Sequence, residues 1–190
     1  MSSSKSKEFC LRAIAHLKTE VKEGSPDEMV LGFEDSPVLK SIGHGLLVAY
    51  LVDEGEIFSY VQNRHLADAG MTIEELDASA LENLARFAYE KAEVRQYGNI
   101  FAVLCGGNFE ASLLLCAQLW STWYSELAPS GYVAAFPCRD ILAFGDADNS
   151  SVILELHALC GRAQGGDHAL TNELFRRVDG TWHPIASDKS

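Results

Sequence analysis

Residues 94–128 read VRQYGNIFAVLCGGNFEASLLLCAQLWSTWYSELA, and this stretch combines strand and helix patterns. Residues 94–97 and 100–105 have strand character, and the Gly98-Asn99 pair between them is a two-residue turn signal, so the pattern predicts a β-hairpin. Thirteen of the twenty residues at 109–128 are apolar and occupy nearly all sides of a helical wheel. A helix that is apolar all round is buried. We therefore expect a central helix at about 109–128.

Helices and strands alternate irregularly on both sides of this stretch. Thr72 and Glu75 form a capping-box pattern ahead of an apolar helical stripe, which predicts a helix up to about Tyr89. Further helices are expected at about 151–162 and 170–177, and further strands at 44–52, 57–61, 132–136 and 141–144, the first two as a hairpin. No regular βαβ repeat occurs, so the predicted class is α+β. It would comprise a mixed or antiparallel sheet of hairpins packed around the central helix, with flanking helices.

The N-terminal segment differs from the rest of the chain in charge. Apolar residues recur at helical spacing from Cys10 to Val21, which predicts an amphipathic helix over residues 5–22. Residues 1–22 hold five basic and two acidic side chains, a balance of +3, so the remaining 168 residues carry −15. We expect a basic amphipathic N-terminal helix at 1–22 and a single α+β domain at 23–190. The basic helix either docks on the acidic body or is an ordinary solvated helix face.

Composition narrows the class of protein. The 190-residue chain has a net charge of −12, and its pI is about 4.8. This acidity argues against a nucleic-acid partner, because phosphate binding uses Lys and Arg. No apolar run approaches the roughly 18 residues of a membrane span, and the first residues lack a signal-peptide core, so we expect a cytoplasmic protein that does not contact membranes. The five cysteines lack a C-x-x-C pair, which fits reduced, mostly buried thiols, and neither a metal nor another cofactor is expected.

Two blocks of sequence stand out as motifs. They are GNFEASLLL at 107–115 followed by Trp120, and Gly131 followed by VAAFP at 133–137 and RDILAF at 139–144. Together with shorter matches at 74–84 and 170–182, they resemble the signature of the YtpQ-like family of uncharacterised bacterial proteins. The resemblance spans about residues 40–182. It implies a shared fold unit and, because the family is a domain of unknown function, no particular chemistry.

The candidate binding residues are Asn108, Glu110, Arg139 and Asp140, with Ser112 beside them. Gly106-Gly107 lead into the predicted helix N-terminus, where backbone N–H groups can bind an anion. In the structural alternative, Asn108 caps that helix and Glu110 complements its dipole. Arg139 offers paired donors to a carboxylate or phosphate ligand, or else it forms a salt bridge with Glu110.

The sequence contains no complete catalytic set. Arg139 beside Cys138 would favour a thiolate, but no histidine lies nearby in the sequence, and no G-x-S-x-G motif occurs. We therefore expect a non-catalytic binding module whose acidic surface recognises a basic protein partner. One concrete form is an immunity or antitoxin-like protein that neutralises a basic toxin domain. The alternative is a small hydrolase or transferase, or a small-ligand sensor, that uses Glu110, Arg139 and Asp140. The sequence leaves the oligomeric state open.

Overall fold

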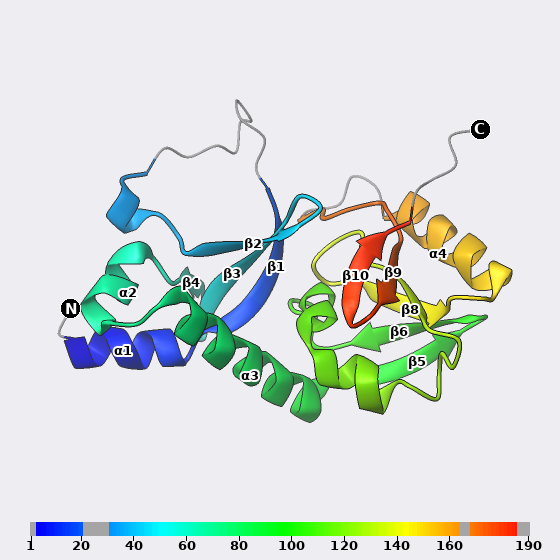
Figure 1. The fold of residues 1–190 in the computed structure, drawn as a ribbon, viewed down its shortest axis with the longest axis horizontal. Coiled ribbons are helices and arrows are strands. Elements are labelled where there is room, and N and C mark those ends of the chain that lie inside the picture. Colours follow the sequence, from blue (N-terminus) through cyan, green and yellow to red (C-terminus); the bar gives the residue numbers. More distant parts are fainter. Residues whose placement is uncertain (1–2, 21–30, 164–167, 186–190) are drawn as a thin grey trace. The chain divides into compact units, whose positions relative to one another are not determined.

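The computed structural model describes residues 3–20, 31–163 and 168–185 (Figure 1). Within these residues, helices accompany ten strands in two antiparallel sheets, which confirms the α+β class. The chain divides into two compact units, residues 1–86 and 87–190. The reason is that the strands pair within each unit: one sheet uses strands between residues 14 and 60, and the other uses strands between residues 93 and 184.

The first unit consists of a small sheet with helices beside it (Figure 1). Its elements are α1 (Ser3–Leu11), β1 (Ile14–Thr19), η1 (Phe33–Asp35), β2 (Leu39–Gly43), β3 (Leu46–Asp53), β4 (Phe58–Tyr60), α2 (Asn63–Ala69) and the start of α3 (Ile73–Lys91). The strand order is β1-β3-β2, and β4 also pairs with β3. The strands predicted at 44–52 and 57–61, and the hairpin that they form, are therefore confirmed.

The helix predicted at 5–22 is wrong over residues 12–20, and the last two residues of that prediction, 21–22, lie outside the described residues. α1 ends at Leu11, and Ile14–Thr19 is strand β1, which pairs with β3 along its whole length. Leu17 fits both a helical stripe and the alternation of a strand, so the local pattern does not choose between them. The side-chain amide of Asn83 donates to the carbonyls of Leu11 and Ala13, both at 2.8 Å. These bonds satisfy carbonyls at the end of the helix, and pairing with the apolar β3 stabilises the strand that follows.

α3 packs against one face of the first sheet. Its capping box is confirmed, because the Thr72 N–H donates to the Glu75 carboxylate at 2.9 Å and the Glu75 N–H donates to the Thr72 hydroxyl at 3.2 Å. The Tyr50 hydroxyl of β3 donates to the Asp77 carboxylate of α3 at 2.9 Å. Side chains alternate across a strand, so the residues of β3 on the Tyr50 face point toward the helix.

The second unit is built on a larger sheet. Its elements after α3 are β5 (Glu93–Tyr97), β6 (Ile100–Leu104), η2 (Ala111–Leu115), η3 (Leu119–Trp123), β7 (Tyr132–Ala135), β8 (Leu142–Asp146), α4 (Ser150–Arg162), β9 (Phe175–Val178) and β10 (Thr181–Pro184). The strand order is β10-β9-β7-β8-β6-β5. The hairpin predicted at 94–105, the strands at 132–136 and 141–144 and the helix at 151–162 are confirmed.

The short helix predicted at 170–177 is wrong. The chain forms strand β9 at Phe175–Val178, which pairs with β7 and then with β10. The turn between β9 and β10 is Asp179-Gly180, and both residues have positive φ angles, of 49° and 83°. Such a turn favours a tight hairpin. Pairing on both sides of β9 therefore overrides its weak helical pattern.

The continuous helix predicted at 109–128 is replaced by two short helical turns. Ala111–Leu115 is a 3₁₀-helix and Leu119–Trp123 is a π-helix, with Cys116 in a non-helical conformation between them. In the π-turn the Tyr124 N–H donates to the Leu119 carbonyl at 2.9 Å, whereas an α-helix would direct it to the carbonyl of Trp120. That carbonyl instead accepts the Tyr132 hydroxyl of β7, at 2.7 Å.

Burial of this segment is only partly as the sequence predicts, because Trp123 is 43% exposed and Ala117 is also exposed. Trp120 is only 1% exposed, and its indole N–H donates to the Leu113 carbonyl at 3.1 Å. The ring makes edge contacts with Tyr132 of β7, Phe144 of β8 and Trp182 of β10. The buried side chains of these two helical turns therefore pack against one face of the second sheet.

Candidate functional site

Glu110 is the most deeply buried of the candidate residues. It lies in the loop between β6 and η2, and it is only 3% exposed. One carboxylate oxygen, Oε1, accepts the N–H groups of Cys105 and Gly107, both at 2.7 Å. The other, Oε2, accepts the N–H of Phe109 at 3.1 Å. The loop thus wraps its backbone donors around its own carboxylate.

This arrangement bears directly on the anion-site hypothesis for Gly106-Gly107. Both glycines have positive φ angles, of 87° and 86°, which turn the backbone around the carboxylate. A nest of N–H groups suits an anion, and here Glu110 is the anion that occupies it. Asn108 lies half-buried in the same loop and does not begin a helix, since the first helical turn starts after Glu110. The geometry favours a structural role for Glu110, although by a different route from helix capping.

Arg139 reaches this loop through its backbone. Its carbonyl accepts the Ala111 N–H at 3.0 Å, and its own N–H donates to the His168 carbonyl at 3.3 Å. Among the residues that the structure describes, no ion pair joins the Arg139 guanidinium to Glu110. The segments of Arg139 and Glu110 therefore lie side by side. A backbone hydrogen bond joins them, and the expected salt bridge does not.

Cys138 has an unreactive environment. Burial, together with the Asp140 carboxylate that accepts a hydrogen bond from the thiol, raises the pKa of Cys138 to about 12. This is the opposite of the effect expected from a guanidinium beside it. A thiol nucleophile acts as the thiolate, so Cys138 stays protonated and weakly reactive at neutral pH.

The other thiols are similarly protected. All five cysteines are free and buried, which confirms the expectation of buried, unpaired thiols. Burial raises the pKa of Cys105 to about 11 and that of Cys116 to about 12, with smaller contributions from Glu110 and Cys105, respectively. Burial also raises the pKa values of Cys10 and Cys160. None of these environments is the electropositive, exposed setting of a catalytic cysteine.

Asp140 alone among the four candidate residues lines a groove of the second unit. The groove has a volume of about 370 Å³, and its walls come from β5, β6, β8, α4 and the loop before β8. Asp140 is exposed on this wall, and Arg162 and Tyr97 join it from α4 and β5. The sequence does not single out Arg162, because a basic residue in the last turn of a helix is explained by the helix dipole alone.

A second polar cluster, in the first unit, also escapes sequence reasoning. Asp77 of α3 is buried, and its carboxylate accepts the Tyr50 hydroxyl at 2.9 Å and the Lys40 ammonium at 2.5 Å. Burial and this carboxylate raise the pKa of Tyr50. The signal was available, since Asp77 follows Leu76 and falls one turn after Ile73, within the apolar stripe of the helix. A carboxylate in such a stripe requires a buried partner.

Over residues 3–20, 31–163 and 168–185, no group of three or more His, Cys, Asp or Glu side chains is arranged to hold a metal ion. In the same part of the chain, no helix has both the length and the apolar character needed to cross a membrane.

Comparisons with protein families, with curated protein sequences and with solved structures found no match. The resemblance to the YtpQ-like family therefore stays a prediction from the sequence.

Proposed function

We propose that this protein is a non-catalytic module that binds a basic protein partner through an acidic surface of its first unit. The charge is acidic in both units: residues 1–86 hold eight basic and fifteen acidic side chains, a balance of −7, and residues 87–190 hold seven and twelve, a balance of −5. Complementary charge orients two proteins and accelerates their encounter.

The observation that carries the proposal is the turn between β3 and β4. Asp53, Glu54 and Glu56 are exposed there, and Ile57 is 63% exposed directly after them. Asp53 accepts the Gly55 N–H at 2.7 Å and Glu54 accepts the Ser59 hydroxyl, bonds that order the turn. The Arg12 guanidinium donates to the Asp53 backbone carbonyl at 3.2 Å, so one positive charge lies beside the three carboxylates. None of the three carboxylates forms an ion pair with a described residue. An exposed apolar side chain that directly follows three exposed carboxylates suits a basic partner with an apolar pocket.

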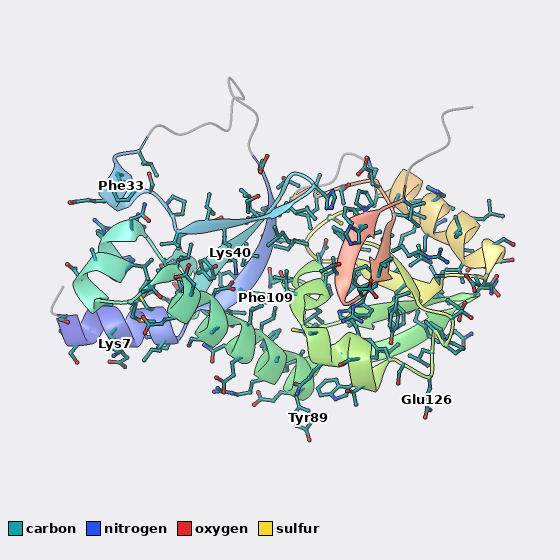
Figure 2. All side chains as sticks on the ribbon, in the orientation of Figure 1. Lys7, Phe33, Lys40, Tyr89, Phe109 and Glu126 are labelled. Carbon is teal, nitrogen blue, oxygen red and sulfur yellow. The ribbon has the colours of Figure 1, made fainter. Side chains whose placement is uncertain are left out.

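Phe33 gives a second instance of the same chemistry. It is 81% exposed on η1 and precedes Glu34 and Asp35, away from the strands of the sheet (Figure 2). Here Asp35 does form an ion pair with Arg64, at 2.8 Å, so this position is less acidic than the β3–β4 turn. We therefore assign the main contact to the turn.

The catalytic alternative has less support. The Glu110 carboxylate accepts hydrogen bonds from the backbone of its own loop, and burial raises the pKa of the Cys138 thiol. Arg139 does not line the groove that Asp140 lines. A hydrolase or transferase needs a nucleophile or base that is free to reach a substrate. These residues do not form such a set.

The test is a capture experiment from a lysate with the immobilised protein, followed by identification of the bound proteins and elution in a salt gradient. We expect basic proteins that elute as the salt concentration rises, because screening weakens exposed charge pairs. The variant D53N/E54Q/E56Q should lose them. The variant E90Q/E126Q/E173Q, which removes three exposed carboxylates elsewhere, should retain them. If both variants lose the basic proteins equally, or if the salt concentration does not affect their binding to the wild-type protein, the assignment of the turn is contradicted.

The immunity form of the proposal has a sharper test. It requires that the captured protein be a toxin domain, and that the gene beside this one encode it. Co-expression of the wild-type chain should then restore growth of cells that produce the toxin, and D53N/E54Q/E56Q should restore it less. Growth that is independent of the wild-type chain would refute the immunity form.

A further inference from the structure

The groove of the second unit lies where α4 leaves the sheet uncovered. Val152, Leu156 and Cys160 of α4 are buried in a core that includes Ala143 of β8. Ala102 of β6 pairs directly with Ala143, so both side chains lie on the face that α4 packs against. Ala102 is nevertheless only half-buried, and the groove of about 370 Å³ opens beside it. The sheet face therefore continues as an apolar floor beyond the edge of the helix.

Two opposite charges border this floor. Arg162 comes from the last turn of α4 and is exposed, and it has no hydrogen-bond or ion-pair partner among residues 3–20, 31–163 and 168–185. Asp140 is exposed on the loop before β8, and its carboxylate accepts a hydrogen bond from the Cys138 thiol. In the described part of the chain Asp140 and Arg162 form no ion pair with each other. Both charges thus remain available to a ligand in the groove.

We propose that this groove binds a small zwitterion with an apolar body, the chemistry of an apolar α-amino acid. The guanidinium of Arg162 would hold the carboxylate with its paired donors, and the carboxylate of Asp140 would hold the ammonium group. The apolar side chain of the ligand would cover Ala102, Leu104 and Leu159, which line the groove. The volume lies within the usual range for small-molecule sites, and the lining combines an apolar surface with few polar groups. The inference is independent of the proposed protein partner.

The ligand panel separates the two charges of the zwitterion. L-leucine is compared with 4-methylpentanoic acid, which lacks the ammonium group, and with 3-methylbutylamine, which lacks the carboxylate. We expect chemical shift changes at Ala102 and Leu159 on titration of the full chain with leucine, and about 10-fold weaker binding of each truncated analogue, because charge-assisted hydrogen bonds are strong. No shift with leucine at about 10 mM would overturn the proposal.

The variants assign each charge to its residue. R162Q should weaken leucine binding about 10-fold and leave the amine unaffected, whereas D140N should weaken leucine and leave 4-methylpentanoic acid unaffected. Ala102→Phe, which fills the floor, should abolish binding of all three ligands. The matched controls are R86Q and E126Q, which remove exposed charges from other places. Equal affinity in R162Q and the wild-type protein, with the fold intact by circular dichroism, would refute the site.

Discussion

The carboxylate of Glu110 lies at the centre of a loop whose backbone N–H groups donate to it. Three backbone N–H groups converge on its two oxygens, at 2.7, 2.7 and 3.1 Å. Such a loop would otherwise bury unsatisfied donors, which is costly. The same residues that resemble an anion site in the sequence therefore form a closed structural unit. At this scale, chemistry that looks functional in sequence is explained by local hydrogen bonding.

Replacement of Glu110 by glutamine should destabilise the second unit. Whichever way the new amide is oriented, its NH₂ group faces a backbone N–H donor. We expect a loss of about 2–3 kcal/mol in the free energy of unfolding, measured by chemical denaturation, because a buried hydrogen-bond network is broken. The control is E126Q on the exposed turn after η3, which should change the free energy by less than about 0.5 kcal/mol. Equal stability of E110Q and the wild-type protein would contradict this account of the loop.

At the scale of elements, the π-turn at Leu119–Trp123 exchanges a regular helix for a bond to the sheet. The Trp120 carbonyl accepts the Tyr132 hydroxyl, and Trp120 packs against the rings of three strands. Aromatic contacts of this edge-to-face kind add to the free energy of burial. Tertiary packing therefore determines the conformation of a segment whose composition favours a helix.

Removal of one hydroxyl tests this exchange. Tyr132→Phe keeps the ring and leaves the Trp120 carbonyl without its donor, so we expect a loss of about 1–2 kcal/mol in the free energy of unfolding. The matched control is Tyr89→Phe, because Tyr89 is 76% exposed and the substitution keeps the contact of its ring with Trp123, at 5.5 Å between centroids (Figure 2). It should leave stability unchanged. A similar effect of both substitutions would show that the hydroxyl bond is not what stabilises the turn.

At the scale of the whole molecule, the buried thiols make stability depend on alkaline pH. Burial raises the pKa values of Cys105, Cys116 and Cys138 from the ordinary 9.0 to about 11, 12 and 12. The unfolded chain releases these protons near pH 9, while the folded chain retains them. The stability is therefore fully present below about pH 9 and is lost as the pH rises through 11 and 12.

The measurement is urea denaturation between pH 7 and 11. We expect the free energy of unfolding to fall above pH 9, where the unfolded state binds fewer protons than the folded state. Cys116→Ala removes one of the thiols and should give a shallower decline, relative to its own stability at pH 7. Tyr124, whose pKa burial raises to about 12, contributes to the slope in both proteins. Stability that stays constant up to pH 11 would contradict the pKa shifts.

The candidate site could be predicted only in part. The spacing of Asn108 and Glu110, and the Arg139-Asp140 pair, identified two segments that do lie side by side, through the bond between Ala111 and Arg139. The occupation of the loop by Glu110 itself was not predicted, because it depends on the path of the backbone through two left-handed glycines. Arg162 and Asp140 come together only when α4 packs on the sheet.

The amino-acid sequence by itself determined the α+β class, the hairpins at 44–61 and 94–105, the capped helix that begins after Thr72 and the acidity of the chain. Each of these depends on interactions between residues that are close in sequence, or on composition alone. Only the tertiary structure decided that Ile14–Thr19 is a strand, that the apolar stretch at 109–128 breaks into two turns and that the chain forms two units. In each case the local pattern fits two conformations, and pairing or packing with distant residues stabilises one of them.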